Sequence, residues 1–300
     1  STASVQSSLV MYPIYKYGNE EQRMKYLPKL ATGEWMGCFG LTEPDYGSNP
    51  GGMITNFKDM GDHYLLNGAK MWTTAAKAAD RLLVLARSDR NAAKKHHGLT
   101  AFFVDAKSKG ITASLLPKLG MRAMGSCSVT YDDVFVPDCD VLGEPHMAWG
   151  AMLPSLNNER IMVGAQCLGA IDGVLEDALA YMMQRKAFGK YIGEFQILQH
   201  YVADIATSQK LTELLLYNVA WMQAKGMACG NEANMLKMVA TENAVKAADL
   251  GIQILGGMGY SAETDMQRYW RDHRILRMTP ISNEMVRNSI AENLGLPRSF

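Results

Sequence analysis

The sequence has no excess of charge of either sign and no long apolar run. Thirty basic side chains balance thirty acidic ones over its 300 residues, so no overall field draws the chain toward nucleic acid or a membrane surface. No apolar run approaches the ~20 residues that a membrane-spanning helix needs. The segment from Ser1 to Tyr12 lacks the basic start and apolar core of a signal peptide. The sequence therefore predicts no nucleic-acid partner and no membrane span.

Paired cysteines are also missing. The five cysteines are scattered, odd in number and without C-x-x-C spacing: Cys38, Cys127, Cys139, Cys167 and Cys229. This pattern is typical of reduced thiols in an intracellular protein, and not of a disulfide framework or a zinc site. We expect free thiols and no bound metal.

What the sequence does have is three successive kinds of pattern. Residues 1–36 place charges on one helical face and end at Gly33, which predicts helix. Residues 37–140 contain short β-like runs, and Asn67-Gly68 lies between two apolar stretches, the usual signal of a hairpin turn. Residues 141–300 return to helical spacing. Pattern alone predicts an α+β protein in which a small β domain leads into an antiparallel helical bundle, and it identifies no function.

The C-terminal region divides into long helical blocks separated by glycine-containing loops. Apolar residues such as Leu175, Leu179 and Met182 recur at the spacing that a bundle core needs. The expected long helices cover residues 150–183, 195–226 and 231–256, and shorter ones cover 263–272 and 282–293.

Six short motifs carry a resemblance to a known family. In chain order they read FGLTEPDYGSN (39–49), LNGAKMWTT (66–74), LNNERIMVGAQCLG (156–169), QRKAFGK (184–190), QILGGMGY (253–260) and YWRDHRI (269–275). Any one of them is weak evidence, because a lone Gly-Gly pair is usually a helix cap or a close-packing site. Together, and in this order, they make the chain resemble an acyl-CoA dehydrogenase.

The resemblance implies a fold, a cofactor and partners. The fold is a remainder of an N-terminal helical domain (1–36), most of which is absent, a small β-barrel or sandwich (37–140) and an antiparallel four-helix bundle (141–300). The cofactor is FAD, the substrate is an acyl-CoA thioester, and an electron-transfer flavoprotein is the expected electron acceptor. The bacterial cytoplasm and the mitochondrial matrix both fit such a protein.

The motifs of the β region imply one set of flavin contacts. By themselves, Leu41-Thr42 could open an ordinary turn, and an isolated Trp is usually core. The resemblance assigns Leu41 and Thr42 to the flavin ring and Ser48 to the flavin and the CoA chain. Trp72 and Thr74 stand at alternate positions, hence on one face of a strand, and are assigned to the edge of the ring.

The motifs of the helical region imply a second set of contacts. The Arg185 guanidinium suits a pyrophosphate and the Phe188 ring suits adenine, whereas the glycine pair lets backbone approach the phosphates. In the family these residues hold the FAD of a neighbouring subunit, which implies a homodimer or homotetramer. The residues assigned to the neighbour's FAD are Arg185, Phe188, Gln196, Gln253, Gly256 and Gly257, and the positions of Ser282 and Glu284 match those near the flavin-contacting residues of the usual motif.

Oxidation of a saturated acyl-CoA requires a base that takes the α-proton as hydride leaves the β-carbon for flavin N5. The commonest family position for that base falls here on Pro280-Ile281-Ser282, which contains no carboxylate. A minority of the family, the isovaleryl-CoA and long-chain type, carries the glutamate directly before an arginine on the first long helix. Glu159-Arg160 matches that arrangement, so Glu159 is the predicted base.

Other residues near these positions receive secondary roles. Asn157 and Arg160 are predicted at the substrate, with Ser48, and Glu284 is a less favoured base. Pro280 has no N–H, so one donor to the thioester oxygen is missing unless Ile281 or another neighbour supplies it.

Two alternatives stay open at this point. A relative with the same Glu-Arg helix could run the reverse reaction as an enoyl-CoA reductase. The chain could instead be a catalytically weak subunit that binds FAD or CoA beside an active homologue. The motifs report neither the direction of the reaction nor the length of the acyl chain.

Overall fold

The computed structural model describes residues 2–89 and 97–298, which form two compact units. Unit 1 comprises the described residues up to Lys118 together with Arg122–Glu159. Unit 2 comprises Leu119–Met121 and the described residues from Arg160 onward. The predicted domain boundaries at residues 36 and 140 stay a prediction.

Unit 1 begins with the predicted helical segment. Asn19 caps the longest of these helices, because its side chain accepts a hydrogen bond from the Gln22 amide and the Gln22 side chain accepts one in return. Gly33 ends that helix in the left-handed conformation, at φ 78°, so the predicted stop is confirmed. The elements are α1 (Thr2–Ser4), the π-helix η1 (Val5–Met11), α2 (Tyr12–Tyr17) and α3 (Glu20–Thr32).

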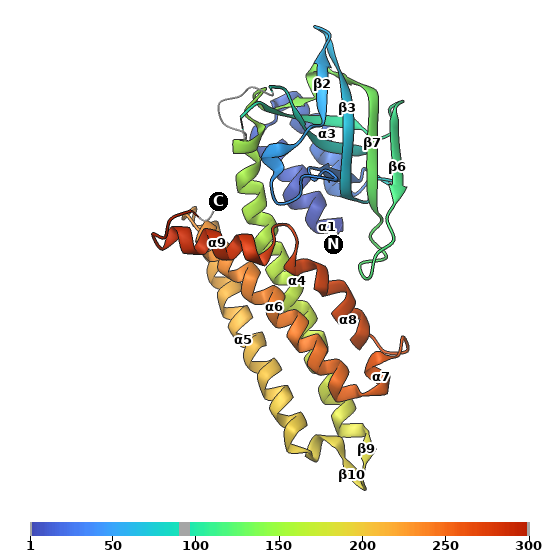
Figure 1. Ribbon diagram of the computed structural model, residues 1–300, viewed down its shortest axis with the longest axis vertical. Coiled ribbons are helices and arrows are strands. Elements are labelled where there is room, and N and C mark those ends of the chain that lie inside the picture. The colour runs from blue at the N-terminus through green and yellow to red at the C-terminus, as the bar shows by residue number, and fades with distance from the viewer. Residues whose placement is uncertain (1, 90–96, 299–300) are drawn as a thin grey trace. The chain divides into compact units, whose positions relative to one another are not determined.

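A mixed sheet follows, in which β6, β7, β3 and β2 lie side by side (Figure 1). The order of strands is β6-β7-β3-β2-β4-β5-β8, and β1 pairs with β4 in parallel. The sheet is open, so the β domain is not a closed barrel. The strands are β1 (Gly37–Gly40), β2 (Asn56–Asp59), β3 (His63–Thr74), β4 (Arg81–Arg87), β5 (Leu99–Asp105), β6 (Ile111–Leu115), β7 (Ser126–Pro137) and β8 (Val141–Leu142), with 3₁₀ turns η2 (Pro50–Gly52) and η3 (Asp138–Asp140).

The predicted hairpin turn at Asn67-Gly68 is wrong. Both residues lie inside the 12-residue strand β3, where the pairing with β7 shifts register between Leu66 and Gly68. A Cβ on Gly68 would lie 2.6 Å from the Thr55 hydroxyl, so close approach to the next segment explains the glycine better than a turn does. Asn67 donates a side-chain hydrogen bond to Asp133, across the bulge.

Strands β4 and β5 are buried on both faces and divide the core of unit 1. Leu82 and Val84 face a cluster with β3 and β7, whereas Leu83 and Leu85 face a cluster with the N-terminal helices. Tyr26 of α3 packs edge-on against Phe103, with ring centroids 4.5 Å apart. This double burial explains why both strands read as continuous apolar runs without alternation.

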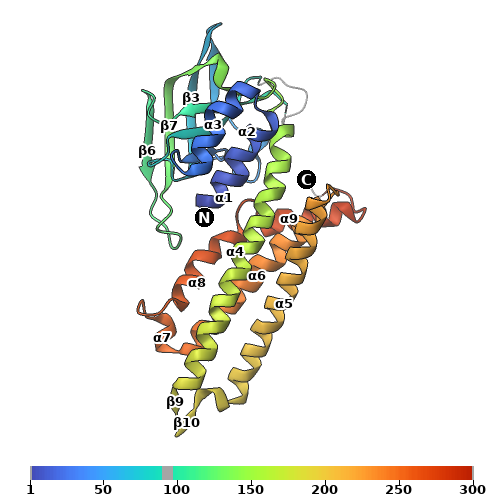
Figure 2. The same ribbon diagram turned by 180° about the vertical axis from the view of Figure 1, so that it is seen from behind.

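Unit 2 is a bundle of antiparallel helices, as predicted (Figures 1 and 2). Its core follows Val163, Cys167, Ile171 and Val174, which recur at helical spacing and pack against the third long helix. The elements are α4 (Ala148–Gln184), whose residues up to Glu159 belong to unit 1, β9 (Lys186–Ala187), β10 (Lys190–Tyr191), η4 (Ile192–Glu194), α5 (Gln196–Ala224), α6 (Gly230–Leu255), α7 (Gly257–Tyr260), α8 (Met266–His273), η5 (Arg274–Arg277) and α9 (Asn283–Asn293).

Two further sequence predictions concern cysteines and membranes. All five cysteines are free thiols, and four of them are buried. Among the described residues, no helix combines the length and the apolar character needed to cross a membrane.

Candidate active site

Glu159 occupies a core position of α4 within unit 1. Ala148, Met152, Ser155 and Glu159 recur at helical spacing and are all buried, so the carboxylate lies on the buried stripe of the helix. Glu159 itself is 8% exposed. Its Oε2 accepts hydrogen bonds from two hydroxyls, Ser4 Oγ at 2.8 Å and Ser8 Oγ at 2.9 Å. The predicted base is therefore buried and held by neutral donors from the N-terminal helices.

Two other carboxylates of unit 1 are buried, and both have a cationic partner. Glu43 forms an ion pair with Lys70 at 2.9 Å, and Asp140 forms one with Lys25 at 3.6 Å. Asp140 also accepts a hydrogen bond from Tyr26. These groups are neutralised within the fold, whereas the hydrogen bonds to Glu159 come from hydroxyls that carry no charge.

Asn157 and Arg160 flank the base on the same helix and are partly buried. Burial lowers the pKa of the Arg160 guanidinium from its ordinary value. Asn157 belongs to unit 1 and Arg160 to unit 2, so their contribution to one substrate site stays a prediction.

Two residues of β3, Lys70 and Met71, hold the backbone of Leu41 and Thr42 by hydrogen bonds. The Lys70 ammonium donates to the Leu41 carbonyl at 3.0 Å, and the Met71 amide donates to the Thr42 carbonyl at 2.7 Å. Burial lowers the pKa of Lys70 to about 8, although Glu43 opposes this shift. Burial raises the pKa of Glu43, but Lys70 and the donors at Ile54 and Thr55 outweigh burial, so the pKa lies below its ordinary value.

Glu43 also closes the loop that carries Ser48. Its carboxylate accepts hydrogen bonds from the amides of Ile54 at 2.7 Å and Thr55 at 2.9 Å, at the far end of the loop. Ser48 is exposed between these two anchored ends. The Ser48 hydroxyl is therefore exposed to solvent on a loop whose two ends are anchored by the buried Glu43–Lys70 ion pair.

Trp72 and Thr74 flank the buried Thr73 near the end of β3. Trp72 is 52% exposed and has φ 61°, a left-handed conformation that a bulky side chain seldom adopts. The pairing with β7 shifts register between Lys70 and Thr73, so one extra residue stands here on β3. The expected plain alternation is therefore interrupted, and the bulge directs a large ring outward.

The connection between α4 and α5 carries Arg185, Phe188 and Gln196, all exposed. Phe188 and Gly189 form the two-residue turn of the β9–β10 hairpin, with φ 52° and 81°. Phe188 is 95% exposed and meets the Phe195 ring edge-on, with centroids 6.2 Å apart. Apart from this edge contact, nearly all of the Phe188 ring is accessible to a ligand.

Gln253 and the two glycines lie at the C-terminal end of α6. Gly256 has φ 60° and ψ −134°, which a side chain would oppose, and a Cβ on Gly256 or Gly257 would meet no atom within 4 Å. In both views this end of unit 2 is also where β9 and β10 lie (Figures 1 and 2). The backbone there is open to a ligand.

Ser282 and Glu284 lie at the opposite end of the bundle, at the start of α9 (Figures 1 and 2). Ser282 is the N-cap, and its hydroxyl accepts a hydrogen bond from the Met285 amide at 3.3 Å. Glu284 is exposed, and its own backbone amide, ahead of Ser282 and nearby arginines, lowers the pKa of its carboxyl group. An exposed carboxylate of lowered pKa is a poor proton acceptor, which disfavours Glu284 as the base.

Lys237 of α6 anchors the segment that lacks the common glutamate. Its buried ammonium donates to the carbonyls of Arg277 at 3.3 Å and Ile281 at 2.6 Å, and to Asn283 Oδ1 at 2.7 Å. Burial lowers the pKa of Lys237 to about 8. The segment around Pro280 is therefore shaped from inside the bundle.

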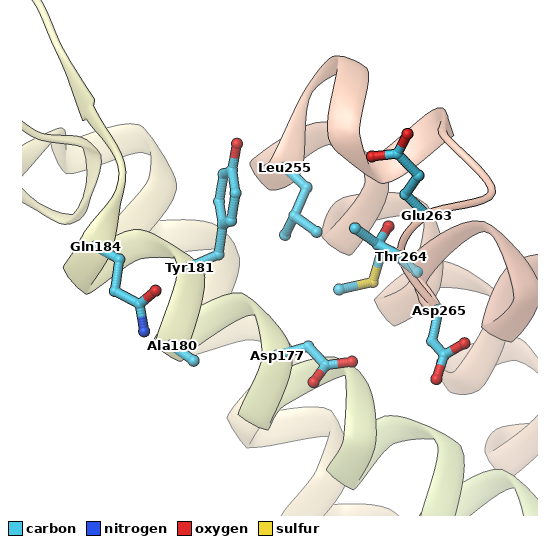
Figure 3. Close-up of a pocket in the computed structure, with 9 residues that line it drawn as sticks. Asp177, Ala180, Tyr181, Gln184, Leu255, Glu263, Thr264 and Asp265 are labelled. Carbon is cyan, nitrogen blue, oxygen red and sulfur yellow. The ribbon is translucent and has the colours of Figure 1, made fainter.

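A pocket of about 410 Å³ opens between α4 and the segment that leads into α8 (Figure 3). Tyr181 and Gln184 project from α4 on one side, and Glu263 and Asp265 lie on the other. Asp265 already pairs with Arg268 at 2.7 Å. The lining contains none of the residues predicted for the site, but Gln184 and Leu255 directly precede the predicted residues Arg185 and Gly256 in the chain.

Comparison with known proteins places the chain. The model of the acyl-CoA dehydrogenase C-terminal domain matches residues 149–295, that of the middle domain matches 38–134, and that of the N-terminal domain matches 1–34. An acyl-CoA dehydrogenase of Bacillus subtilis is 36% identical over 292 residues, which are 97% of this chain and 76% of that protein. The chain belongs to the acyl-CoA dehydrogenase family.

Two further members of the acyl-CoA dehydrogenase family are informative. The caffeyl-CoA reductase–Etf complex subunit CarC of Acetobacterium woodii is 37% identical over 270 residues, 90% of this chain and 71% of that protein. A glutaryl-CoA dehydrogenase of Mycobacterium smegmatis, solved in complex with FADH2, superposes with a TM-score of 0.93 at 32% identity, covering 100% of this chain and 76% of that one. As an acyl-CoA dehydrogenase family member, the chain is an oxidoreductase, and its α+β fold is confirmed.

The residues that the motifs predict for FAD fit such a group in each unit. In unit 1, the half-exposed Trp72 directly follows Met71, whose amide anchors the Thr42 carbonyl. In unit 2, the open Gly256-Gly257 backbone and the exposed Phe188 and Arg185 are at one end of the bundle. Exposed aromatic rings and unobstructed glycines are features that a large planar ligand with phosphates can use.

Sequence reasoning missed the partners of several site residues. Glu43 and Lys70 both stand inside the motifs, but 27 positions apart, and no local signal pairs them. Ser4 and Ser8 stand 155 and 151 positions from Glu159, and two serines one turn apart on a helix are too common to mark a site.

Proposed function

We propose that the chain is a FAD-dependent acyl-CoA dehydrogenase in which Glu159 removes the α-proton of an acyl-CoA thioester to give the 2-enoyl-CoA. The observation that carries this proposal is the environment of Glu159, a carboxylate 8% exposed whose two hydrogen bonds come from uncharged hydroxyls. A carboxylate without a bound cation keeps its capacity to accept a proton. The absence of any carboxylate at Pro280-Ile281-Ser282 supports the same assignment.

FAD, when bound, supplies the acceptor for the hydride that leaves the β-carbon. The residues of unit 1 that would hold its ring are Leu41, Thr42, Ser48, Trp72 and Thr74. Lys70, paired with Glu43, anchors the Leu41 carbonyl by a hydrogen bond. Asn157, Arg160 and Ser48 would contact the substrate.

Charge that develops on the thioester oxygen needs hydrogen-bond donors. Pro280 has no amide hydrogen, and the Thr279–Pro280 peptide is cis. We assign this role to a neighbouring amide of the same segment, Ile281 being the first candidate, because it is the first residue after Pro280 that carries a backbone N–H.

Glu159→Gln tests the proposal. Glutamine keeps the shape of the side chain but cannot accept the proton, so acyl-CoA should still bind while anaerobic bleaching of the flavin slows by about 10²–10⁴-fold. The measurement is stopped-flow absorbance with a panel of acyl-CoA thioesters, and the matched control is Glu284→Gln, which should bleach at nearly the wild-type rate. Normal bleaching in Glu159→Gln and slow bleaching in Glu284→Gln would overturn the assignment.

The reverse reaction is the second candidate function. The 37% identity to a caffeyl-CoA reductase subunit favours it specifically. In that direction Glu159, protonated, returns the α-proton to an enoyl-CoA. Mixing photoreduced protein with enoyl-CoA thioesters in the same stopped-flow experiment, together with a measurement of the reduction potential of the bound flavin, decides the direction, because a reductase needs a flavin potential below that of the enoyl-CoA/acyl-CoA couple.

The proposal includes an electron-transfer flavoprotein as redox partner and a homo-oligomer as the working form. The relative from Acetobacterium woodii is named as a subunit of a complex with Etf. Ser282 and Gly256 are at opposite ends of α6, and the helix between Lys237 and Leu255 is about 27 Å long at 1.5 Å per residue. A separation of this order supports the assignment of Ser282 and of Gly256-Gly257 to two different FAD molecules, with the glycines on the FAD of a neighbouring subunit.

A further inference from the structure

We infer that Ser4 and Ser8 are positioning residues for Glu159: their hydroxyls hold Oε2 and leave Oε1 as the oxygen that takes the α-proton. This inference rests on the proposed function, since it concerns how the proposed base is oriented. It assigns a role to the N-terminal helices of unit 1 that no sequence motif indicated.

The geometry comes from two elements of unit 1. Ser4 ends α1 and is 1% exposed, and Ser8, within the π-helix η1, is 4% exposed. Their hydroxyls lie 2.8 and 2.9 Å from the same carboxylate oxygen, and the single Ser8 proton is shared between that oxygen and the Ser4 carbonyl at 2.6 Å. Short π-helical segments are rare and are frequently found at functional sites.

Two donors on one oxygen restrict the rotation of the carboxylate. Without them the terminal torsion of a glutamate is broad, and either oxygen could face the substrate. With them, the plane of the carboxylate is set by the helices that carry Ser4 and Ser8. Because hydroxyls are neutral, they orient the carboxylate without the full neutralisation that a lysine gives Glu43.

The step is a single proton transfer coupled to oxidation. The α C–H bond breaks, its proton goes to Glu159 Oε1, and its electron pair forms the α,β double bond; a bound FAD would supply the acceptor for the hydride that leaves the β-carbon. Ser4 and Ser8 touch none of the reacting atoms in this scheme. They act through the orientation of Glu159, on which proton-transfer rates depend strongly.

Proton abstraction can be measured apart from oxidation. A 3-thia acyl-CoA carries sulfur at the β-position, so it can lose an α-proton but no β-hydride. Its α-hydrogens exchange with solvent deuterium when the base works, and NMR or mass spectrometry records the rate. A merely structural role of the serines would alter flavin content or melting temperature and leave this exchange unchanged in the folded fraction.

The variants are Ser4→Ala, Ser8→Ala and the double variant, with Ser7→Ala as matched control. Ser7 belongs to the same helical segment, and its hydroxyl returns to the Ala3 carbonyl at 2.8 Å. The control is matched because Ser8 Oγ also donates to a backbone carbonyl one turn earlier, that of Ser4 at 2.6 Å. Ser7→Ala and Ser8→Ala therefore both lose a hydroxyl-to-carbonyl hydrogen bond, and only Ser8→Ala also loses the contact with Glu159. Ser8→Thr keeps a hydroxyl and serves as the rescue variant.

We expect Ser4→Ala or Ser8→Ala to slow α-hydrogen exchange by about tenfold, the loss expected from one hydrogen bond to a charged group. The double variant should lose about 100-fold, with Ser7→Ala near wild type and Ser8→Thr largely restored. If Glu159→Gln abolishes exchange but both serine variants exchange normally, this inference is wrong and the proposed function stands. If Glu159→Gln exchanges normally, the base assignment itself fails.

Discussion

At the scale of single residues, the two buried glutamates Glu43 and Glu159 differ in what surrounds their charge. Lys70 and Glu43 are 0% and 2% exposed in their side chains and lie 2.9 Å apart, so each neutralises the other. Glu159 lies in a similarly buried position but accepts hydrogen bonds from hydroxyls. The Lys70–Glu43 pair anchors the backbone near Leu41, whereas the hydroxyls around Glu159 leave its carboxylate able to accept a proton.

The ion pair makes a prediction about stability. Lys70→Met should lower the free energy of unfolding by roughly 3–5 kcal/mol, because it leaves the Glu43 charge buried without its partner. Adding Glu43→Gln should recover much of that loss, since the amide is neutral. The measurement is urea unfolding followed by circular dichroism.

Lys107→Met is the control for this experiment. Lys107 pairs with Asp80 at 3.1 Å but its side chain is 78% exposed, so its loss should cost less than about 1 kcal/mol. Equal costs for Lys70→Met and Lys107→Met would contradict the view that the buried pair supports the Thr42 backbone.

At the scale of elements, the junction between α6 and α9 decides the shape of the segment around Pro280. Lys237 ties together the carbonyls of Arg277 and Ile281 and the side chain of Asn283. Asn283 is fully buried and also bonds the Thr241 hydroxyl at 3.1 Å. The Lys237 ammonium thus supplies hydrogen bonds to backbone carbonyls that this short irregular segment cannot pair within itself.

The contribution of this junction should depend on pH. The pKa of Lys237 in the folded protein is about 8, below the ordinary 10.5. Between these values the unfolded chain binds more protons, so the free energy of unfolding should rise with pH from about 8 to about 10.5. Lys237→Met should lack this rise, so that the cost of the substitution grows with pH when measured by urea unfolding.

Lys246→Met provides the comparison on the same helix. The Lys246 side chain is 66% exposed and lies 3.7 Å from Asp204, so its removal should have a small effect that does not change across this range. A cost of Lys237→Met that stays flat or falls between pH 8 and 10 would refute the argument.

At the scale of the whole molecule, an apolar stripe on α5 is exposed to solvent. Leu211, Leu214, Tyr217 and Trp221 recur at helical spacing and are 57, 58, 67 and 54% exposed. A helix of a bundle ordinarily turns such residues inward. The stripe and the exposed Phe188 are what the proposed homo-oligomer would cover.

The assembly prediction joins this stripe to the cofactor. The wild-type protein should sediment as a flavinated dimer or tetramer, whereas Leu214→Glu with Trp221→Glu should sediment as a smaller species that retains little FAD. The reason is that Arg185, Phe188 and Gly256-Gly257 then have no neighbouring FAD to hold. Gln223→Glu, a charge on the other side of α5, should leave both properties unchanged, and a fully flavinated monomer would contradict the proposal.

The sequence by itself determined the elements whose signals are local. The long helices begin and end within a few residues of their predicted bounds, because apolar spacing, caps and glycines act within a turn or two. The same kind of signal was misleading at Asn67-Gly68, where a glycine is needed because Thr55 lies too close to leave room for a side chain. The motifs also named the family and singled out Glu159 as the candidate base.

Only the tertiary structure decided which groups surround these residues. It left the sheet open, bulged β3 at Trp72, paired Lys70 with Glu43 and set Ser4 and Ser8 on Glu159. The partners of a buried charge come from segments up to 155 positions away, and nothing in the adjacent residues records them. Local pattern reports the path of the chain, whereas the desolvation of a charge depends on everything that folds against it.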